Sequence, residues 1–158
     1  MKAKHLKLSL MIAIMTVVGG CNNAPRQFKL QFIMETMNNY RTTLELDERG
    51  GYVITSQNFF MDRHAGKAAP ETNFGELTQA ETDRLKSLMQ RCNLMKMDDA
   101  YGFETDANPV TENIIYQIIY NADGKEKMIT IRYNPDIKLP ATYVALHEFF
   151  IDCLKKYS

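Results

Sequence analysis

The stretch NIIYQIIYNADGKEKMITIRY, residues 113–133, decides the fold. Two runs rich in isoleucine and tyrosine, Asn113–Tyr120 and Lys127–Tyr133, flank a polar segment that contains Asp123 and Gly124. β-branched and aromatic residues favour strands, and an Asp-Gly pair between two such runs is typical of a tight hairpin turn. The stretch therefore predicts an antiparallel hairpin.

Further strands are predicted in the first third of the chain. From Phe28 to Glu35 a large apolar side chain recurs at every second position, which is the period of a half-buried strand. Two shorter runs, Tyr40–Leu46 and Tyr52–Thr55, are separated by acidic residues and glycines and predict a second hairpin. Together with the hairpin at residues 113–133, these runs predict a sheet of about four to five strands.

Two helices are predicted from caps and apolar stripes. Thr78 and Glu81 have the spacing of a capping box, in which each side chain accepts from the other residue's backbone amide. Apolar residues then recur along one helical face as far as Cys92. A second helix is expected from Ala141 to about Lys156, with a similar apolar stripe that ends at Cys153.

The order of these elements predicts an α+β fold. Strands joined by short turns, with helices that each have one apolar stripe, favour an antiparallel sheet with both helices packed on one face. Two stretches, Gln57–Glu76 and Asp98–Glu112, show neither period and are longer than most connections in compact domains. We expect both to be irregular loops.

The amino terminus has the three parts of an export signal. Residues 1–7 are basic, Leu8–Val18 is almost wholly apolar, and two glycines precede Cys21. A helix of about 11 residues spans only about half of the ~30 Å hydrocarbon core of a bilayer. We therefore expect residues 1–20 to direct export and to be removed.

The sequence Val18-Gly19-Gly20-Cys21 resembles the lipobox of bacterial lipoproteins. The resemblance implies cleavage before Cys21 and a diacylglycerol on that cysteine, which would anchor the chain to a membrane. Two alternatives remain open: Cys21 is an ordinary cysteine after an ordinary signal peptide, or residues 1–20 are an uncleaved anchor.

The segment after Cys21 is short. Fully extended, residues 22–27 reach about 20 Å, so the domain formed by residues 28–158 is expected close to the bilayer. Asn22 is not the aspartate that retains lipoproteins of some Gram-negative groups at the inner membrane. We expect the outer membrane, on its periplasmic side.

Composition narrows the choice of partners. Residues 21–158 are enough for one domain with its own core. The signal contains three of the 19 basic residues, which leaves 16 against 19 acidic residues and a net charge of −3. This balance argues against a general nucleic-acid binder and against strong attraction to anionic lipid.

Four features together resemble the short lipoproteins of unknown function that are common in Bacteroides-type bacteria. They are the lipobox, the helix start Leu77–Glu81, the hairpin at residues 113–133 and Pro140 before the last helix. The resemblance implies a class of protein and a place in the cell envelope. It implies no activity.

No catalytic, metal or cofactor motif is recognised. His147-Glu148 begins a zinc-protease pattern, but Ile151 occupies the position of the second histidine. Asp98, Asp99, Glu104 and Asp106 lack the spacing of a calcium loop and are interpreted as a solvated acidic loop. We therefore expect no enzyme activity, no metal and no cofactor, with a hydrolase only as a third reading.

A candidate contact site for a partner lies in the first irregular stretch. Phe59, Phe60, Arg63 and His64 combine apolar area with hydrogen-bond donors, as interface centres do. The alternative is that the two phenylalanines complete the core as a further strand.

Two cysteines follow the signal and Cys21. Cys92 and Cys153 lie on the apolar stripes of the two predicted helices, where a disulfide would form in an oxidising compartment. The alternative is two buried free thiols.

The combined reading is a lipid-anchored, non-catalytic binding or interaction module of the cell envelope. The alternative is an inhibitor or accessory subunit of an envelope enzyme.

Overall fold

The computed structural model describes residues 27–36, 40–58, 69–103 and 114–158, which form one mixed sheet of seven strands and two α-helices. The strands are β1 (Phe28–Thr36), β2 (Tyr40–Asp47), β3 (Gly51–Asn58), β4 (Glu71–Glu76), β5 (Ala100–Tyr101), β6 (Ile114–Ala122) and β7 (Lys125–Arg132). The helices are α2 (Gln79–Cys92) and α3 (Ala141–Tyr157), and a short 3₁₀ helix, η1 (Leu94–Lys96), follows α2.

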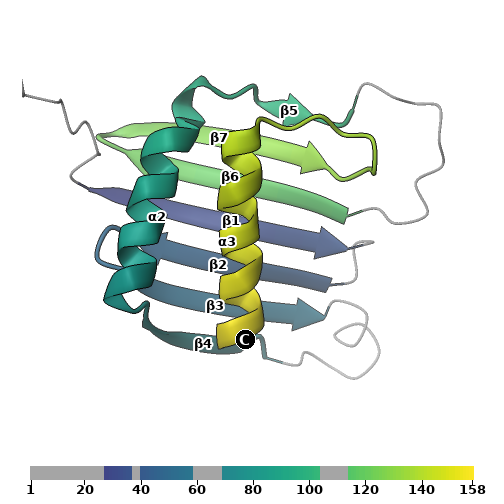
Figure 1. The fold of residues 1–158 in the computed structure, drawn as a ribbon. Helices are drawn as coiled ribbons and strands as arrows, with labels where there is room; N and C mark the ends of the chain where they lie inside the picture. The colour runs from purple at the N-terminus through teal and green to yellow at the C-terminus, as the bar shows by residue number, and fades with distance from the viewer. Residues whose placement is uncertain (1–26, 37–39, 59–68, 104–113) are drawn as a thin grey trace, which may run out of the picture.

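The strand order is β4-β3-β2-β1-β6-β7-β5. Every neighbouring pair is antiparallel except β5 with β7, which is parallel. β1 lies at the centre of the sheet and pairs with β2 on one side and β6 on the other. The starts of β1, β3 and β7 lie at one end of the sheet, and the two hairpin turns lie there too (Figure 1).

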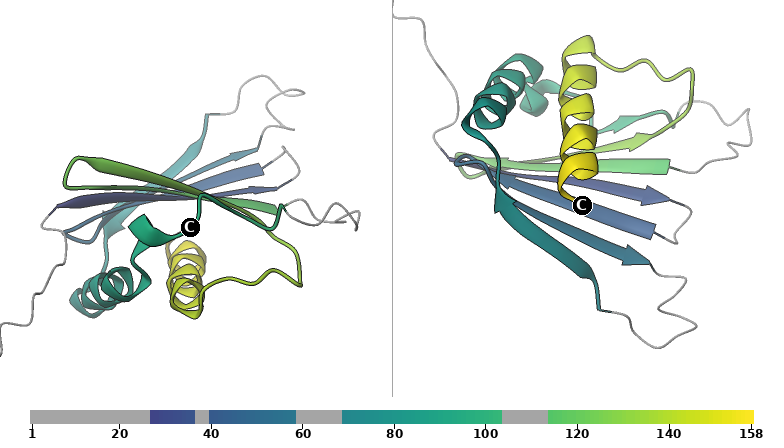
Figure 2. Two further views of the ribbon diagram at one scale, coloured as in Figure 1. Left: turned by 90° about the horizontal axis from the view of Figure 1, so that it is seen from above. Right: turned by 60° about the horizontal axis from the view of Figure 1, so that its bottom comes forward.

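Both helices cover one face of the sheet and run side by side across its strands (Figures 1 and 2). The core lies between this face and the helices. Its largest fully buried side chains come from the strands and from both helices, and they include Phe32, Leu44, Ile54, Leu85, Ile118, Ile129, Tyr143, Phe149 and Phe150. Neither helix in the part of the chain that the structure describes has the length and apolar character needed to cross a membrane.

In strand β1, the apolar residues that alternate in the sequence form the buried side of the strand. Phe28, Leu30 and Phe32 point into the core and are buried, whereas Lys29 and Gln31 point to the other face. The centroid of the Phe32 ring lies 4.9 Å from the centroid of the Phe150 ring on α3. The period of two therefore places the apolar half of the strand under the helices, as predicted.

The predicted capping box is confirmed at the start of α2. The amide of Glu81 donates to Thr78 Oγ1, and Glu81 Oε2 accepts from the amide of Thr78 at 2.9 Å. Glu81 also joins the two helices, because its carboxylate accepts from Lys156 Nζ at 2.8 Å and from the Tyr157 hydroxyl at 2.7 Å. The hydrogen bond from Lys156 is the main reason that the pKa of Glu81 falls to about 2.

The two predicted hairpins are present. Between β2 and β3, Asp47 Oδ1 accepts from the amides of Arg49 at 2.8 Å and Gly51 at 2.9 Å. Between β6 and β7, Asp123 and Gly124 both have positive φ, 50° and 75°. A turn of this kind matches the twist of the flanking strands, and glycine adopts it without steric cost.

The α+β class is confirmed, but the expected sheet of four to five antiparallel strands is too small. β4 lies in the stretch 57–76 and β5 in the stretch 98–112, both expected to be irregular. β4, with the sequence ETNFGE, is exposed on both faces apart from Gly75, so it has no apolar alternation. β5 has only two residues, and its parallel pairing with β7 makes the sheet mixed.

Candidate binding groove on the helix-free face

The second face of the sheet carries no helix from the described ranges, and we call it the helix-free face. Its side chains are those that alternate with the core residues along each strand. The strand register aligns them in rows across the sheet. One row reads Phe74, Val53, Glu45, Gln31, Ile119 and Met128, from β4 to β7.

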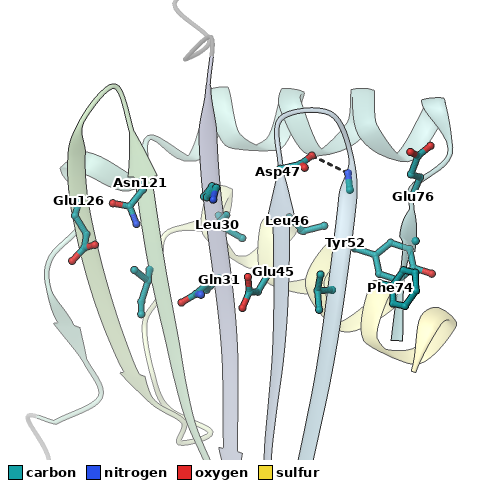
Figure 3. A pocket seen from close by; sticks show the side chains of 15 residues that line it. Leu30, Gln31, Glu45, Leu46, Asp47, Tyr52, Phe74, Glu76, Asn121 and Glu126 are labelled. Atoms are coloured by element: carbon teal, nitrogen blue, oxygen red, sulfur yellow. Dashed lines mark hydrogen bonds between the residues drawn. The ribbon is translucent and has the colours of Figure 1, made fainter. Parts of the chain in front are cut away.

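A groove of about 720 Å³ follows this row (Figure 3). It lies at the end of the sheet where β1 begins, and six strands contribute to its lining. The lining residues are Lys29, Leu30, Gln31, Glu45, Leu46, Asp47, Gly51, Tyr52, Val53, Phe74, Gly75, Glu76, Ile119, Asn121 and Glu126.

The charged side chains of the groove are mainly acidic. Glu45, Asp47, Glu76 and Glu126 provide four carboxylates, against one ammonium group from Lys29. Asp47 already accepts two backbone hydrogen bonds within the β2–β3 turn, as the dashed line in Figure 3 shows for one of them. The carboxylates of Glu45, Glu76 and Glu126 are turned to solvent, where they can pair with a cationic ligand.

Phe74 provides the most exposed apolar surface of the groove. Its side chain is 81% exposed, and it stands opposite Val53 on the neighbouring strand. A phenylalanine so exposed loses the free energy of burial unless a partner covers it. The apolar edge and the surrounding carboxylates together suit a ligand that carries both positive charge and apolar area.

The strand that presents Phe74 is supported from its other side. The Tyr52 ring lies over Gly75, where a Cβ atom would come within 2.6 Å of the Tyr52 hydroxyl oxygen. The same ring packs against Tyr157 of α3, with 4.6 Å between the centroids and an angle of 30° between the ring planes. Gly75 therefore allows β4 to rest against the aromatic pair, and Phe74 is held pointing away from the core.

Most of the site residues predicted from the sequence are not described by the structure. Cys21 and the four residues Phe59, Phe60, Arg63 and His64 lie outside the described residues, so the structure does not test their roles. Of the predicted site residues, the structure describes only Cys92 and Cys153, and neither lines the groove. The groove residues come from strands that the sequence predicts and from β4, which it does not predict.

Cys92 and Cys153 are both free, buried thiols in the structure, on α2 and α3. The disulfide between them stays a prediction. Burial raises the pKa of Cys92 to about 11 and that of Cys153 to about 12. Cys92 Sγ lies 3.8 Å from Met97 Sδ, which is a contact typical of a core.

His147 is part of an aromatic cluster. Its Nδ1 lies 3.3 Å from the Tyr143 hydroxyl, and its ring meets those of Phe32 and Tyr116 edge-on. Burial lowers the pKa of His147, because the charged form is poorly solvated there. Across the described ranges, no three His, Cys, Asp or Glu side chains are grouped as metal ligands.

Sequence reasoning missed the main residues of the groove. Phe74 stands alone among polar residues, and this isolation after Pro70 is the one local signal of an exposed apolar contact. Glu45 and Glu126 are far apart in the sequence and share a site only through the strand register.

Comparison with known proteins adds no assignment. No protein-family model matches the chain, and no curated protein matches it significantly.

Proposed function

We propose that this chain is a lipid-anchored, non-catalytic binding module of the bacterial cell envelope, and that the groove on the helix-free face holds its partner. The observation that carries the proposal is Phe74, 81% exposed at the rim of a groove with four carboxylates. Exposed aromatic side chains flanked by charge are typical of protein contact sites.

The start of β1, to which the proposed tether leads, lies at the same end of the sheet as the groove. Lipid on Cys21 would leave a tether of residues 22–27, which reaches about 20 Å at most. β1 begins at Phe28, beside the groove residues Lys29 and Gln31. The groove would then work close to the membrane, and we propose the periplasmic side of the outer membrane.

The anchor is tested by fractionation. Replacing Cys21 with Ser removes the acceptor of the lipid, so the protein is expected to move from the membrane fraction to the soluble periplasmic fraction. Gly19→Ala keeps the cysteine and is expected to stay with membranes. A Cys21→Ser protein that remains on membranes after a carbonate wash would refute the anchor.

The groove is tested by site-specific crosslinking in cells. A photo-crosslinking amino acid at Val53, inside the groove, is expected to form a discrete adduct with one envelope protein. The same amino acid at Gln90, which is exposed on α2, is the control and is expected to form none. Equal adducts from both positions would refute the groove as the binding site.

The same adduct separates the two functions weighed from the sequence. If the partner is an enzyme whose activity rises when this chain is deleted, the alternative of an inhibitor is correct. If deletion leaves the activity of the partner unchanged, the interaction module stands.

A further inference from the structure

The outer edge of β4 has a definite pattern of hydrogen-bonding groups. The Leu77 amide, one residue beyond β4, donates to the Gly50 carbonyl at 2.8 Å. The Gly51 amide points the opposite way, toward β2, where Asp47 Oδ1 accepts from it at 2.9 Å. Backbone groups of successive strand residues point to opposite sides. The N–H and C=O groups of Thr72, Phe74 and Glu76 therefore point away from β3.

Nothing in the described ranges pairs with this edge, because β4 is the first strand in the sheet order. β4 is six residues long and contains no proline and no lysine, the residues that most often protect an exposed edge. At the opposite edge, β5 has only two residues. β4 is therefore the longer of the two edge strands, and its outward groups can accept another strand.

The same three residues connect the edge to the groove. Thr72 and Phe74 face Thr55 and Val53 of β3, so their side chains lie on the helix-free face. Glu76 lines the groove on that face as well. A strand added beside β4 would extend the groove by one strand and would cover the exposed side of Phe74.

Charge decides which strand fits. Because Thr72, Phe74 and Glu76 point outward, two antiparallel β4 strands would form the most hydrogen bonds with Phe74 opposite Phe74 and Thr72 opposite Glu76. Such a pair would place a second acidic groove beside the first and would supply no cation for the carboxylates of either groove, so charge favours a cationic strand over a second copy of this chain. Lysine or arginine side chains on the added strand would meet Glu76 and the other carboxylates of the groove.

We propose that β4 accepts an extended cationic segment of a partner polypeptide as an eighth strand of the sheet, with alternate side chains directed over the groove. This inference rests on the proposed function, because it names the chemistry of the partner that the groove holds. Strand addition takes its affinity from backbone hydrogen bonds and its specificity from the alternating side chains.

Three synthetic peptides of about ten residues test the proposal on the protein purified in detergent from cells that express the full chain. The first alternates lysine and threonine and is expected to bind. The second carries the same side chains but is N-methylated at every backbone amide, so it keeps its charge and cannot pair as a strand. The third replaces each lysine with glutamate. Both controls are expected to bind about tenfold more weakly or worse in calorimetric titration.

A matched pair of variants tests the edge itself. Thr72→Pro removes one outward N–H and no hydrogen bond to β3, so it is expected to weaken the cationic peptide about tenfold. Thr72→Ala keeps the N–H and is expected to change the affinity by less than about twofold. Exchange protection of the Asn73 amide, which points to β3, reports whether β4 is still formed in each variant.

Equal binding of the methylated and unmethylated peptides overturns the proposal, and so does the absence of binding at about 1 mM. A dimer of the wild-type protein that Thr72→Pro dissolves assigns the edge to a second copy and also overturns it. If the Asn73 amide loses its exchange protection in Thr72→Pro, β4 is no longer formed in that variant. The three peptides measured on the wild-type protein then test the proposal. A crosslink from Val53 that persists in Thr72→Pro would show that the groove binds a partner without strand addition, so the proposed function would survive.

Discussion

Phe32 and Phe74 are the same residue on opposite faces of one sheet, and their surroundings differ completely. Phe32 is fully buried under α3, whereas Phe74 is 81% exposed on the helix-free face. The helix-covered face is closed by apolar packing, and the other face combines a few apolar side chains with carboxylates. The helix-covered face therefore stabilises the fold, whereas the side chains of the helix-free face are exposed and can contact a partner.

The largest expected effect separates these two phenylalanines. Phe32→Ala should lower the free energy of unfolding by about 3–5 kcal/mol, because it removes a large buried side chain and leaves a cavity. Phe74→Ala should change it by less than about 0.5 kcal/mol, since the side chain is mostly in water already. Urea unfolding followed by circular dichroism measures both. A similar loss for the two variants would mean that Phe74 packs in the core and would remove the basis of the groove.

A smaller effect concerns the carboxylate that joins the two helices of the covered face. Glu81→Gln weakens the capping box and the hydrogen bonds from Lys156 and Tyr157, so it should cost about 1 kcal/mol at pH 7. The folded pKa of about 2 lies below the ordinary value of 4.5, so the stabilisation is fully present above about pH 4.5. It should be lost as the pH falls from about 4.5 to about 2.

Thermal melts across that pH range check the prediction. The wild-type protein should lose more stability between pH 5 and pH 3 than Glu81→Gln does. Asp83→Asn, another carboxylate near the start of α2, is the control and should keep the wild-type slope. Parallel profiles for wild type and Glu81→Gln would contradict the role given to Glu81.

The smallest effect involves no change in stability. Cys92 and Cys153 are buried and their pKa values are raised, so both should resist alkylation by iodoacetamide in the folded protein at pH 8. Both should react fully once the protein is unfolded without reductant, and mass spectrometry counts the added groups. A failure to react after unfolding would show a disulfide between the two helices.

The elements with a regular local pattern were predicted from the sequence, and their boundaries were close to those observed. The hairpin at residues 113–133 and the capping box at Thr78 depend on residues a few positions apart, so the chain itself specifies them. β4 was missed because edge strands need no apolar face. Its residues become a strand only through pairing with β3.

The candidate groove was hidden from sequence reasoning for the same reason. Its residues come from six strands, and only the register places Phe74, Glu45 and Ile119 in one row. The sequence by itself determined the capped helix, the hairpins and which side of each alternating strand is apolar, because these are local patterns. The tertiary structure decided the number of strands, the exposed edge at β4 and the acidic face, because each depends on which distant strands lie side by side.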